Sequence, residues 1–220
     1  MKKIIFGIFA HPDDEAFGPS GTLLKLRSEG YDIHLILLTD GDAGQNIDNV
    51  ADLAATRLAE WQNAATLLGA SSTHALHYPD GKLDDMPVET LETSVRPILD
   101  TILTTYAQPP EVSFVTLEPN GLTGHLDHIA ASKLTLELAQ QLTAHEIWYF
   151  CLDSSQAPLE NTAYYEPRAR EDSYITARID VAPWLETKHR IMDAHYSQRS
   201  DAEMMKALGT SESFHVEILN

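Results

Sequence analysis

Short apolar runs alternate with longer amphipathic segments from the start of the chain to residue 153. The apolar runs are rich in β-branched and aromatic residues, as is typical of strands that are buried on both faces. They cover residues 3–9, 32–38, 73–78, 112–117 and 146–152. Apolar residues at helical spacing predict helices between the strands, at residues 20–29, 50–68, 88–106 and 125–142. This alternation indicates an α/β fold with right-handed βαβ crossovers and a mainly parallel sheet.

After residue 153 the pattern is less regular. Residues 154–172 combine proline with polar residues, which predicts an irregular excursion. Beyond it we expect a strand at 175–181, a helix at 183–195, a short helix at 202–208 and a last strand at 214–219. The chain has no internal repeat and no linker-like segment, so we expect residues 1–220 to form a single domain.

The chain is strongly acidic. Its 33 aspartate and glutamate residues and 15 lysine and arginine residues give a formal net charge of −18. Nucleic acids and anionic membrane surfaces bind basic patches, so this balance argues against both as partners. The hydrophobic fraction of 43% is that of an ordinary globular protein. Composition identifies no partner by itself and leaves open whether the chain forms a homo-oligomer.

Cysteine usage and the N-terminal residues suggest a compartment. Cys151 is the only cysteine in the sequence, so no intrachain disulfide can form, which fits a reducing environment. The apolar run near the N-terminus ends at Ala10 and is followed by charged residues rather than by a signal-peptide cleavage site. No apolar run approaches the roughly 18 residues of a membrane span. We therefore expect a soluble, cytoplasmic protein.

Clusters of histidine and acidic residues follow two of the predicted strands. Residues 10–15 (Ala-His-Pro-Asp-Asp-Glu) come directly after the first strand, and residues 124–128 (Gly-His-Leu-Asp-His) follow the strand at 112–117. Open α/β sheets bind ligands at the carboxyl ends of their strands. We therefore expect the two clusters to form one site. Imidazoles and carboxylates together are a ligand set for a metal ion such as Zn²⁺.

Each cluster also has an ordinary structural interpretation when taken alone, because acidic residues near a helix start commonly act as caps. Together, however, they supply more ligands than a catalytic zinc needs, which is three protein ligands and one open position. His11 and Asp14 lie three residues apart in one loop. His125 and His128 lie three residues apart on one helix face. The surplus residues are available as a general base, as a donor to a developing oxyanion and as a partner that fixes an imidazole tautomer.

The two motifs resemble those of the PIG-L, or LmbE-like, family of zinc-dependent N-deacetylases. Three further segments are similar to family segments: residues 56–60 (Thr-Arg-Leu-Ala-Glu), 78–81 (Tyr-Pro-Asp-Gly) and 195–198 (His-Tyr-Ser-Gln). The resemblance extends from residue 3 to residue 198. It implies a Rossmann-like three-layer sandwich with strand order 3-2-1-4-5 and C-terminal additions. In that order the first and fourth strands, which precede the two motifs, are neighbours.

The resemblance also implies how the metal is held. His11, Asp14 and His128 would be the ligands of Zn²⁺ or of another divalent metal. Asp13 would be the general base that acts on the metal-bound water. Leu126 stands where many relatives have proline, a difference that should affect the rigidity of the loop more than metal binding.

The remaining residues of the motifs receive roles from the same resemblance. His125 would stabilise the tetrahedral intermediate or protonate the leaving amine, and Asp127 would orient the histidine pair. Arg57 and Asp80 would bind the substrate. Two of these residues also have simpler interpretations. Arg57 and Glu60 can form an exposed ion pair on a helix, and Asp80 can be a turn residue.

The expected function is that of a metal-dependent hydrolase that removes the N-acetyl group from a GlcNAc-type sugar or small glycoside. An alternative is an amidase that cleaves a different acyl group from a sugar or thiol conjugate, because the motifs indicate the chemistry better than the acyl group. A more remote alternative is a non-catalytic module that binds a sugar or nucleotide on a Rossmann-like sheet. It would need a Gly-rich phosphate loop after the first strand, where this chain has carboxylates that repel phosphate.

Overall fold

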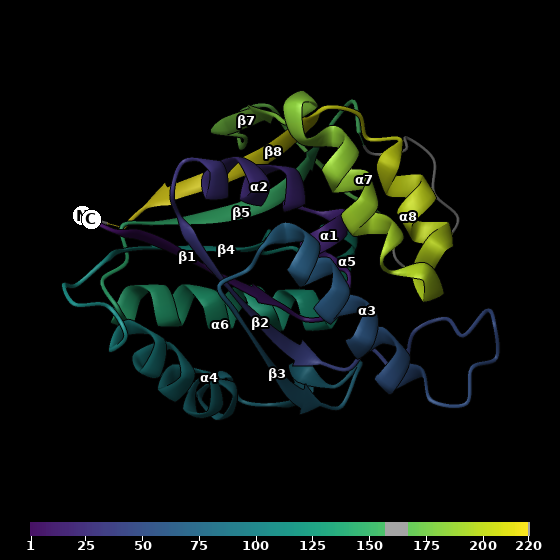
Figure 1. Cartoon of the computed structure of the whole chain (residues 1–220), viewed down its shortest axis with the longest axis horizontal. Helices are drawn as coiled ribbons and strands as arrows, with labels where there is room; N and C mark the ends of the chain where they lie inside the picture. The colour runs from purple at the N-terminus through teal and green to yellow at the C-terminus, as the bar shows by residue number, and fades with distance from the viewer. Residues whose placement is uncertain (157–166, 220) are drawn as a thin grey trace.

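A parallel sheet with helices on both faces forms the centre of the fold (Figure 1). The computed structural model describes residues 1–156 and 167–219. Neighbouring strands in the order β3-β2-β1-β4-β5 are all parallel, which confirms the predicted fold class and strand order. These strands are β1 (Lys3–Phe9), β2 (Asp32–Thr39), β3 (Ser72–Tyr78), β4 (Glu111–Leu117) and β5 (Glu146–Asp153).

The C-terminal segment extends this sheet in the antiparallel sense. Strand β8 (Ser211–Ile218) pairs with β5, and β7 (Ala177–Asp180) pairs with β8. Both strands were expected from the sequence, with bounds that differ by a few residues. A two-residue strand, β6 (Ala169–Arg170), pairs with the end of β5 and was not expected. Part of the predicted excursion at 154–172 lies outside the described residues.

Two layers of helices cover the sheet (Figure 1). Helices α4 and α6 pack on one face, whereas α2, α3 and α7 pack on the other. The α-helices are α1 (Asp14–Phe17), α2 (Ser20–Ser28), α3 (Leu53–Leu68), α4 (Val88–Leu103), α5 (Gly121–Gly124), α6 (Leu126–Gln141), α7 (Leu185–Asp193) and α8 (Arg199–Lys206). Short 3-10 helices are η1 (Leu83–Asp85), η2 (Ala182–Trp184) and η3 (Tyr196–Gln198).

The burial of β1 explains why the strands are continuous apolar runs in the sequence. Ile5 and Phe9 join the hydrophobic cluster beneath α2, α3 and α7. Ile4, Phe6 and Ile8 point to the opposite face and join the cluster beneath α4 and α6. All five side chains are at most 1% exposed. Because successive residues of a strand point to opposite faces, a strand covered on both sides must be apolar at every position.

Helix ends explain the differences between the predicted and observed bounds. Helix α3 starts at Leu53 rather than at residue 50, because the Asp52 carboxylate caps it by accepting the Ala55 N–H at 2.9 Å. It ends as predicted at Gly69, whose φ of 75° is the left-handed conformation of a helix C-terminus. Helix α6 starts one residue later than predicted, since His125 is its cap.

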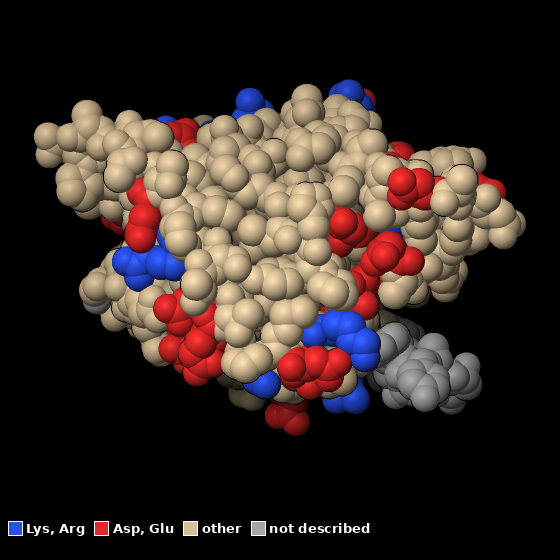
Figure 2. Space-filling view, turned by 90° about the horizontal axis from the view of Figure 1, so that it is seen from below, with Lys and Arg blue, Asp and Glu red and all other residues tan. Residues whose placement is uncertain are grey.

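Charged residues are dispersed on the face shown in Figure 2, where small acidic groups lie among single basic side chains. This distribution differs from the continuous basic surface that nucleic acids require. Within residues 1–156 and 167–219, no helix combines the length and the apolar character needed to cross a membrane.

A buried ion pair ties the last strand to the start of α2. Lys188 and Glu212 are 4% and 1% exposed and form a salt bridge. The Glu212 carboxylate also accepts the backbone N–H groups of Gly21 (2.9 Å) and Thr22 (2.7 Å), at the first turn of α2. Lys188 donates a second hydrogen bond to the carbonyl of Gly18. These donors compensate the buried negative charge of Glu212. Without the carboxylate, the Lys188 ammonium would be buried with no counter-charge.

Glu212→Ala should therefore lower the free energy of unfolding by roughly 3–5 kcal/mol, because it leaves Lys188 buried without its counter-charge. Urea denaturation at neutral pH measures the change. The matched control is Asp100→Ala, which removes an exposed pair with Arg96 and should cost less than about 1 kcal/mol. Equal effects of the two substitutions would contradict this account of the buried pair.

Candidate metal centre and active-site pocket

The loop after β1 presents its acidic side chains at the centre of the sheet, because β1 lies between β2 and β4. Asp14 begins α1, and its Oδ2 accepts the backbone N–H groups of Ala10 (3.1 Å) and His11 (2.9 Å). These bonds fix the carboxylate against its own loop and leave Oδ1 for another partner. Burial opposes ionisation of Asp14, but the nearby His128 and His11 hold its pKa well below the usual range.

Asp13 occupies a strained backbone conformation in the same loop. Its φ of 132° is positive, which is uncommon for a residue other than glycine. Arg57 holds this conformation, because its Nη2 donates to the Pro12 carbonyl at 2.7 Å and to Asp13 Oδ2 at 2.8 Å. Its Nη1 donates to the Gly41 carbonyl at 2.6 Å. The strain and the clamp together fix the direction of the Asp13 carboxylate.

The second loop is shaped by Glu118, which directly follows β4 and is fully buried. Its carboxylate accepts the backbone N–H groups of Asn120 (3.0 Å) and Leu122 (3.2 Å). Leu122 has a positive φ of 60°, so these bonds support another strained turn. The turn points the Gly121 carbonyl at the first turn of α6, where it accepts a hydrogen bond from His128 Nδ1 at 3.0 Å.

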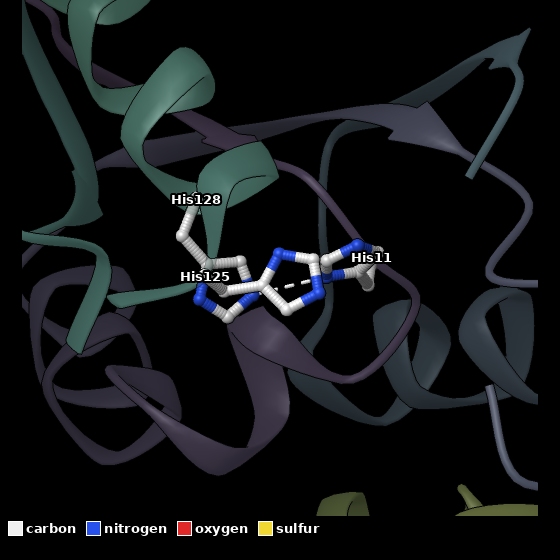
Figure 3. Close-up of side chains that lie close together, drawn as sticks. All are labelled: His11, His125 and His128. Atoms are coloured by element: carbon white, nitrogen blue, oxygen red, sulfur yellow. Dashed lines mark hydrogen bonds between the residues drawn. The ribbon is translucent and has the colours of Figure 1, made fainter. Parts of the chain in front are cut away.

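The two loops bring His11 and His128 together, as Figure 3 shows, and the Asp14 carboxylate lies beside them. His11 Nδ1 lies 2.9 Å from His128 Nε2, and His128 Nε2 lies 3.1 Å from Asp14 Oδ1. His11 Nδ1 lies 3.9 Å from the other Asp14 oxygen, Oδ2, which accepts the backbone N–H groups of Ala10 and His11. Ligand atoms about 2 Å from a tetrahedral zinc ion stand a little more than 3 Å apart, so the spacing suits such an ion.

The hydrogen bonds around the two imidazoles show what the centre needs. His128 gives its Nδ1 proton to Gly121, so its Nε2 carries a lone pair when the ring is neutral. His11 Nε2 faces the carboxylates of Asp80 (3.0 Å) and Asp127 (3.3 Å), so its proton belongs there and Nδ1 carries a lone pair. The two nitrogens and the Asp14 carboxylate therefore converge, and a cation shared between them would stabilise this arrangement. A metal ion fits this donor set.

Asp80 and Asp127 thus both contact His11 of the first motif. Asp127 accepts the backbone N–H groups of Gly81 (2.7 Å) and Leu83 (3.0 Å), and Asp80 Oδ2 accepts the N–H of Ala43 at 2.8 Å. The sequence suggested that Asp127 orients the histidine pair and that Asp80 binds substrate. The structure places the Asp127 carboxylate and one oxygen of Asp80 on His11, and both assigned roles stay predictions.

These carboxylates change the proton affinity of His11. Burial disfavours the charged ring, but hydrogen bonds to Asp127 and Asp80 outweigh it and raise the pKa of His11 to about 10. In the absence of a metal ion, a proton therefore neutralises the surplus negative charge of the centre at neutral pH. A metal ion that binds to Nδ1 must displace that proton.

Arg57 is 4% exposed and forms an ion pair with Asp13, so its interpretation as an exposed partner of Glu60 is wrong. Glu60 instead accepts the backbone N–H and the hydroxyl of Ser197, at 2.8 and 2.6 Å. Burial raises the pKa of Asp13 and the Arg57 guanidinium opposes that rise. The result is a carboxylate with a higher proton affinity than an exposed aspartate, as a general base requires.

His125 lies beside the centre in a neutral form. Its Nδ1 accepts the backbone N–H of Asp127 at 3.2 Å, so the ring proton of the neutral imidazole is on Nε2. Burial and the neighbouring His11 and His128 lower the pKa of His125 to about 4. The ring stacks on His128 with centroids 4.8 Å apart and meets the edge of His11 at 4.6 Å (Figure 3). One nitrogen from each of the three rings lies within 4.8 Å of the other two, a spacing at which the three could hold one metal ion.

Sequence reasoning assigned no role to Glu15, although it belongs to the first motif. Glu15 and His195 are fully buried and pair at 3.1 Å between Oε1 and Nε2. Glu15 Oε2 also accepts the backbone N–H of Asp13 at 3.4 Å. Its position inside the motif was a signal for such a role, as was the resemblance of residues 195–198 to a family segment. Glu118 was missed because a single acid after a strand carries no distinctive pattern.

The centre opens into a cavity of about 470 Å³. Asp13, Asp14, His11, His125 and His128 line it together with Arg57 and Asp80. Of the expected site residues, Asp127 is the one that lies behind the cavity wall rather than in it. A cavity of this size suits a small molecule.

The chain is similar in sequence to a known family and to several known proteins. The PIG-L family model, described as GlcNAc-PI de-N-acetylase, matches residues 6–139. The 1D-myo-inositol 2-acetamido-2-deoxy-alpha-D-glucopyranoside deacetylase of Saccharomonospora viridis is 24% identical over an alignment 224 residues long. This alignment covers 87% of this chain and 83% of that protein. The diacetylchitobiose deacetylase of Thermococcus kodakarensis is 41% identical over 85 residues, which cover 38% of this chain and 32% of that protein.

A solved structure shows the same fold. The N,N'-diacetylchitobiose deacetylase from Pyrococcus horikoshii superposes with a TM-score of 0.70, over 99% of this chain and 84% of that chain, at 20% sequence identity. At this sequence identity the superposition shows that the two proteins share a fold, but it does not identify the substrate. The family model covers more than half of the chain and includes both motifs that build the centre, and the chain therefore belongs to the PIG-L family.

Proposed function

We propose that this chain is a zinc-dependent N-deacetylase that hydrolyses the N-acetyl amide of a small GlcNAc-type sugar or glycoside. One observation carries the proposal. Two imidazole nitrogens and the Asp14 carboxylate converge beside Asp13, a second carboxylate whose side chain is 13% exposed, at the base of a cavity of about 470 Å³. The names of the relatives, which are deacetylases of acetylated amino sugars, support the substrate class.

In this proposal His11, Asp14 and His128 hold the metal. A bound zinc ion acts as a Lewis acid on the amide carbonyl and lowers the pKa of a coordinated water. Asp80 and Asp127 keep the His11 proton on Nε2, and the Gly121 carbonyl keeps the His128 proton on Nδ1. Both rings are thereby held in the tautomer that binds a metal.

Asp13 acts as the general base. Its carboxylate is not one of the three converging ligands, and a hydrogen bond from Arg57 fixes its orientation. Its elevated pKa lets it take a proton from water and later return that proton to the leaving nitrogen. Arg57 and Asp80 line the cavity and are in place to contact the sugar as well, which is the role that the sequence suggested for them.

His125 acts as a neutral hydrogen-bond donor. The sequence left open whether it stabilises the tetrahedral intermediate or protonates the amine. The lowered pKa of His125 disfavours an imidazolium at neutral pH, and the Nε2–H of the neutral ring can still donate to a developing oxyanion. We therefore assign it to the oxyanion and leave the proton for the amine to Asp13. The cytoplasmic location and any self-association stay predictions from the sequence.

Amine release from a panel of N-acetylated sugars tests the function. Release from at least one acetylated amino sugar is expected, with loss of activity after chelation and recovery on addition of zinc. His128→Ala should weaken zinc binding by at least about a hundredfold, because it removes one of three ligands. A competing chromophoric chelator measures the affinity. Activity that survives complete removal of metal would overturn the proposal.

Leu126→Pro is the control for the histidine substitution. Leu126 is 55% exposed and is the first residue of α6, a position where proline is well tolerated. The residue before it, His125, has φ of −65° and ψ of 125°, which a following proline also allows. This variant should bind zinc like the parent chain.

Zinc affinity should rise with pH. The pKa of His11 is raised to about 10, so the metal-free ring is protonated below that pH and neutral above it. Zinc must displace the proton, so its dissociation constant should fall about tenfold per pH unit between roughly pH 7 and 9. Calorimetric titration in buffers of different ionisation enthalpy should count about one released proton per zinc at pH 7. An affinity independent of pH would exclude this competition.

Asp13→Asn should retain zinc but lower kcat by about 10²–10⁴, because the amide cannot accept the proton from water. Asparagine is the appropriate substitute, since it tolerates the positive φ of position 13 better than alanine does. Elemental analysis and the amine-release assay give the two readouts. If Asp13→Asn lost the metal while Asp14→Asn retained it, the roles of the two carboxylates would have to be exchanged.

A further inference from the structure

The wall of the active-site cavity changes character from one side of β1 to the other. This inference rests on the proposed function and concerns the group attached to the sugar nitrogen. On the β2 and β3 side the cavity is polar, with Gln45 from the loop after β2, Asp80 from the loop after β3 and Arg57 from α3. Gln198 joins this side, because its side-chain amide donates to the Gln45 carbonyl at 3.0 Å.

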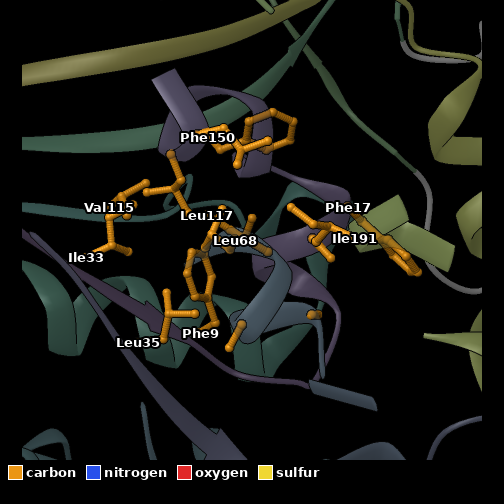
Figure 4. Packing of buried hydrophobic residues seen from close by; sticks show 14 of the residues in the cluster. Phe9, Phe17, Ile33, Leu35, Leu68, Val115, Leu117, Phe150 and Ile191 are labelled. Atoms are coloured by element: carbon orange, nitrogen blue, oxygen red, sulfur yellow. The ribbon is translucent and has the colours of Figure 1, made fainter. Parts of the chain in front are cut away.

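On the β4 and β5 side and along α8 the wall is mainly apolar, although Thr123 and Asp201 also line it. Leu117 ends β4, Leu122 follows it in α5, and Phe17 ends α1. All three belong to one hydrophobic cluster, in which Leu117 and Phe17 are seen among its labelled members in Figure 4. Met205 of α8 packs against the same cluster and also lines the cavity. The cavity thus has a polar half near β2 and β3 and a mainly apolar half formed by residues of α1, β4, α5 and α8.

An amide held at this centre has its two substituents on opposite sides of the reacting carbon and nitrogen. The sugar carries hydroxyl groups, and each one that is buried without a partner costs free energy. The polar half provides several such partners, whereas the apolar half offers Thr123 and Asp201 among mostly apolar side chains. The sugar therefore occupies the polar half, and the acyl group extends along Leu117, Leu122 and Met205.

The apolar half is larger than an acetyl group needs. A single methyl group would contact only a part of a wall made by four or more apolar side chains, in a cavity of about 470 Å³. We propose that the enzyme accepts sugars whose N-acyl group is longer than acetyl, with linear saturated chains of about four to eight carbons. Methionine in the wall suits this role, because its flexible side chain adapts to chains of different length.

The expected effect follows from burial of the added methylene groups. Each one that leaves water for the apolar wall should raise kcat/KM about fourfold until the wall ends. The experiment measures amine release from glucosamine acylated with acetyl, butanoyl, hexanoyl and octanoyl groups, using the zinc-loaded full chain. A second arm uses N-acetylglucosamine with a hexyl group on the anomeric oxygen, which places the same apolar chain on the sugar side.

A rise of kcat/KM from acetyl to hexanoyl, with no gain from the hexyl glycoside, supports the proposal. A fall along the acyl series overturns it and leaves the deacetylase function intact. A gain from the hexyl glycoside without a gain along the acyl series also overturns it, because the apolar half then holds the aglycone. Release from none of the sugars overturns the proposed function itself, and the inference with it.

Substitutions test whether the wall is responsible. Met205→Gln keeps the length of the side chain but makes it polar, so the ratio of kcat/KM for hexanoyl over acetyl should fall severalfold. Met204→Gln is a second variant at the more exposed neighbour, which is 52% exposed and also lines the cavity. Ile218→Gln is the matched control, because this residue is 60% exposed at the end of β8 and outside the cavity. An unchanged ratio in both methionine variants, with folding intact by circular dichroism, overturns the assignment.

Discussion

The approach of two imidazole nitrogens from distant loops is the constraint on which the site depends. His11 and His128 are 117 positions apart in the chain, and His11 Nδ1 lies 2.9 Å from His128 Nε2. A proton or a metal ion shared by the two nitrogens makes such a contact favourable. The adjacency of β1 and β4 makes the contact possible, because it brings the ends of both strands to one point of the sheet. The metal site therefore depends on the pairing of β1 with β4 in the sheet.

Buried carboxylates complete the arrangement, and each has its own cationic or donor partner. Asp13 pairs with Arg57, and Glu15 pairs with His195. Asp127 receives two backbone N–H groups in addition to His11. Burying so many acids is tolerated because their charges are compensated locally. The same compensation separates their proton affinities, since a carboxylate beside His128 ionises more readily than one that is buried beside Arg57.

Short-range patterns in the sequence predicted the strands and the gathering of the two motifs, whereas the strand order came from the resemblance to the PIG-L family. A strand buried on both faces is apolar throughout, and a ligand cluster directly after a strand must lie at the end of that strand. The partner of Asp127 could not be predicted, because spacing along the chain does not reveal which of several nearby imidazoles a carboxylate reaches across the sheet. The burial of Arg57 was hidden for a similar reason. Its spacing from Glu60 suits an exposed pair, whereas the loops that cover it come from distant segments.

The link between Glu212 and α2 has a consequence for the order of events during synthesis. The first turn of α2 lies 191 residues before the carboxylate that accepts its N–H groups. While the chain is still emerging from a ribosome, that helix start and the Lys188 ammonium both lack their acceptor. The layer of helices beside the metal loop is therefore completed late, when β8 joins the sheet. The N-terminal motif is made early, but the packing behind it depends on one of the last strands to appear.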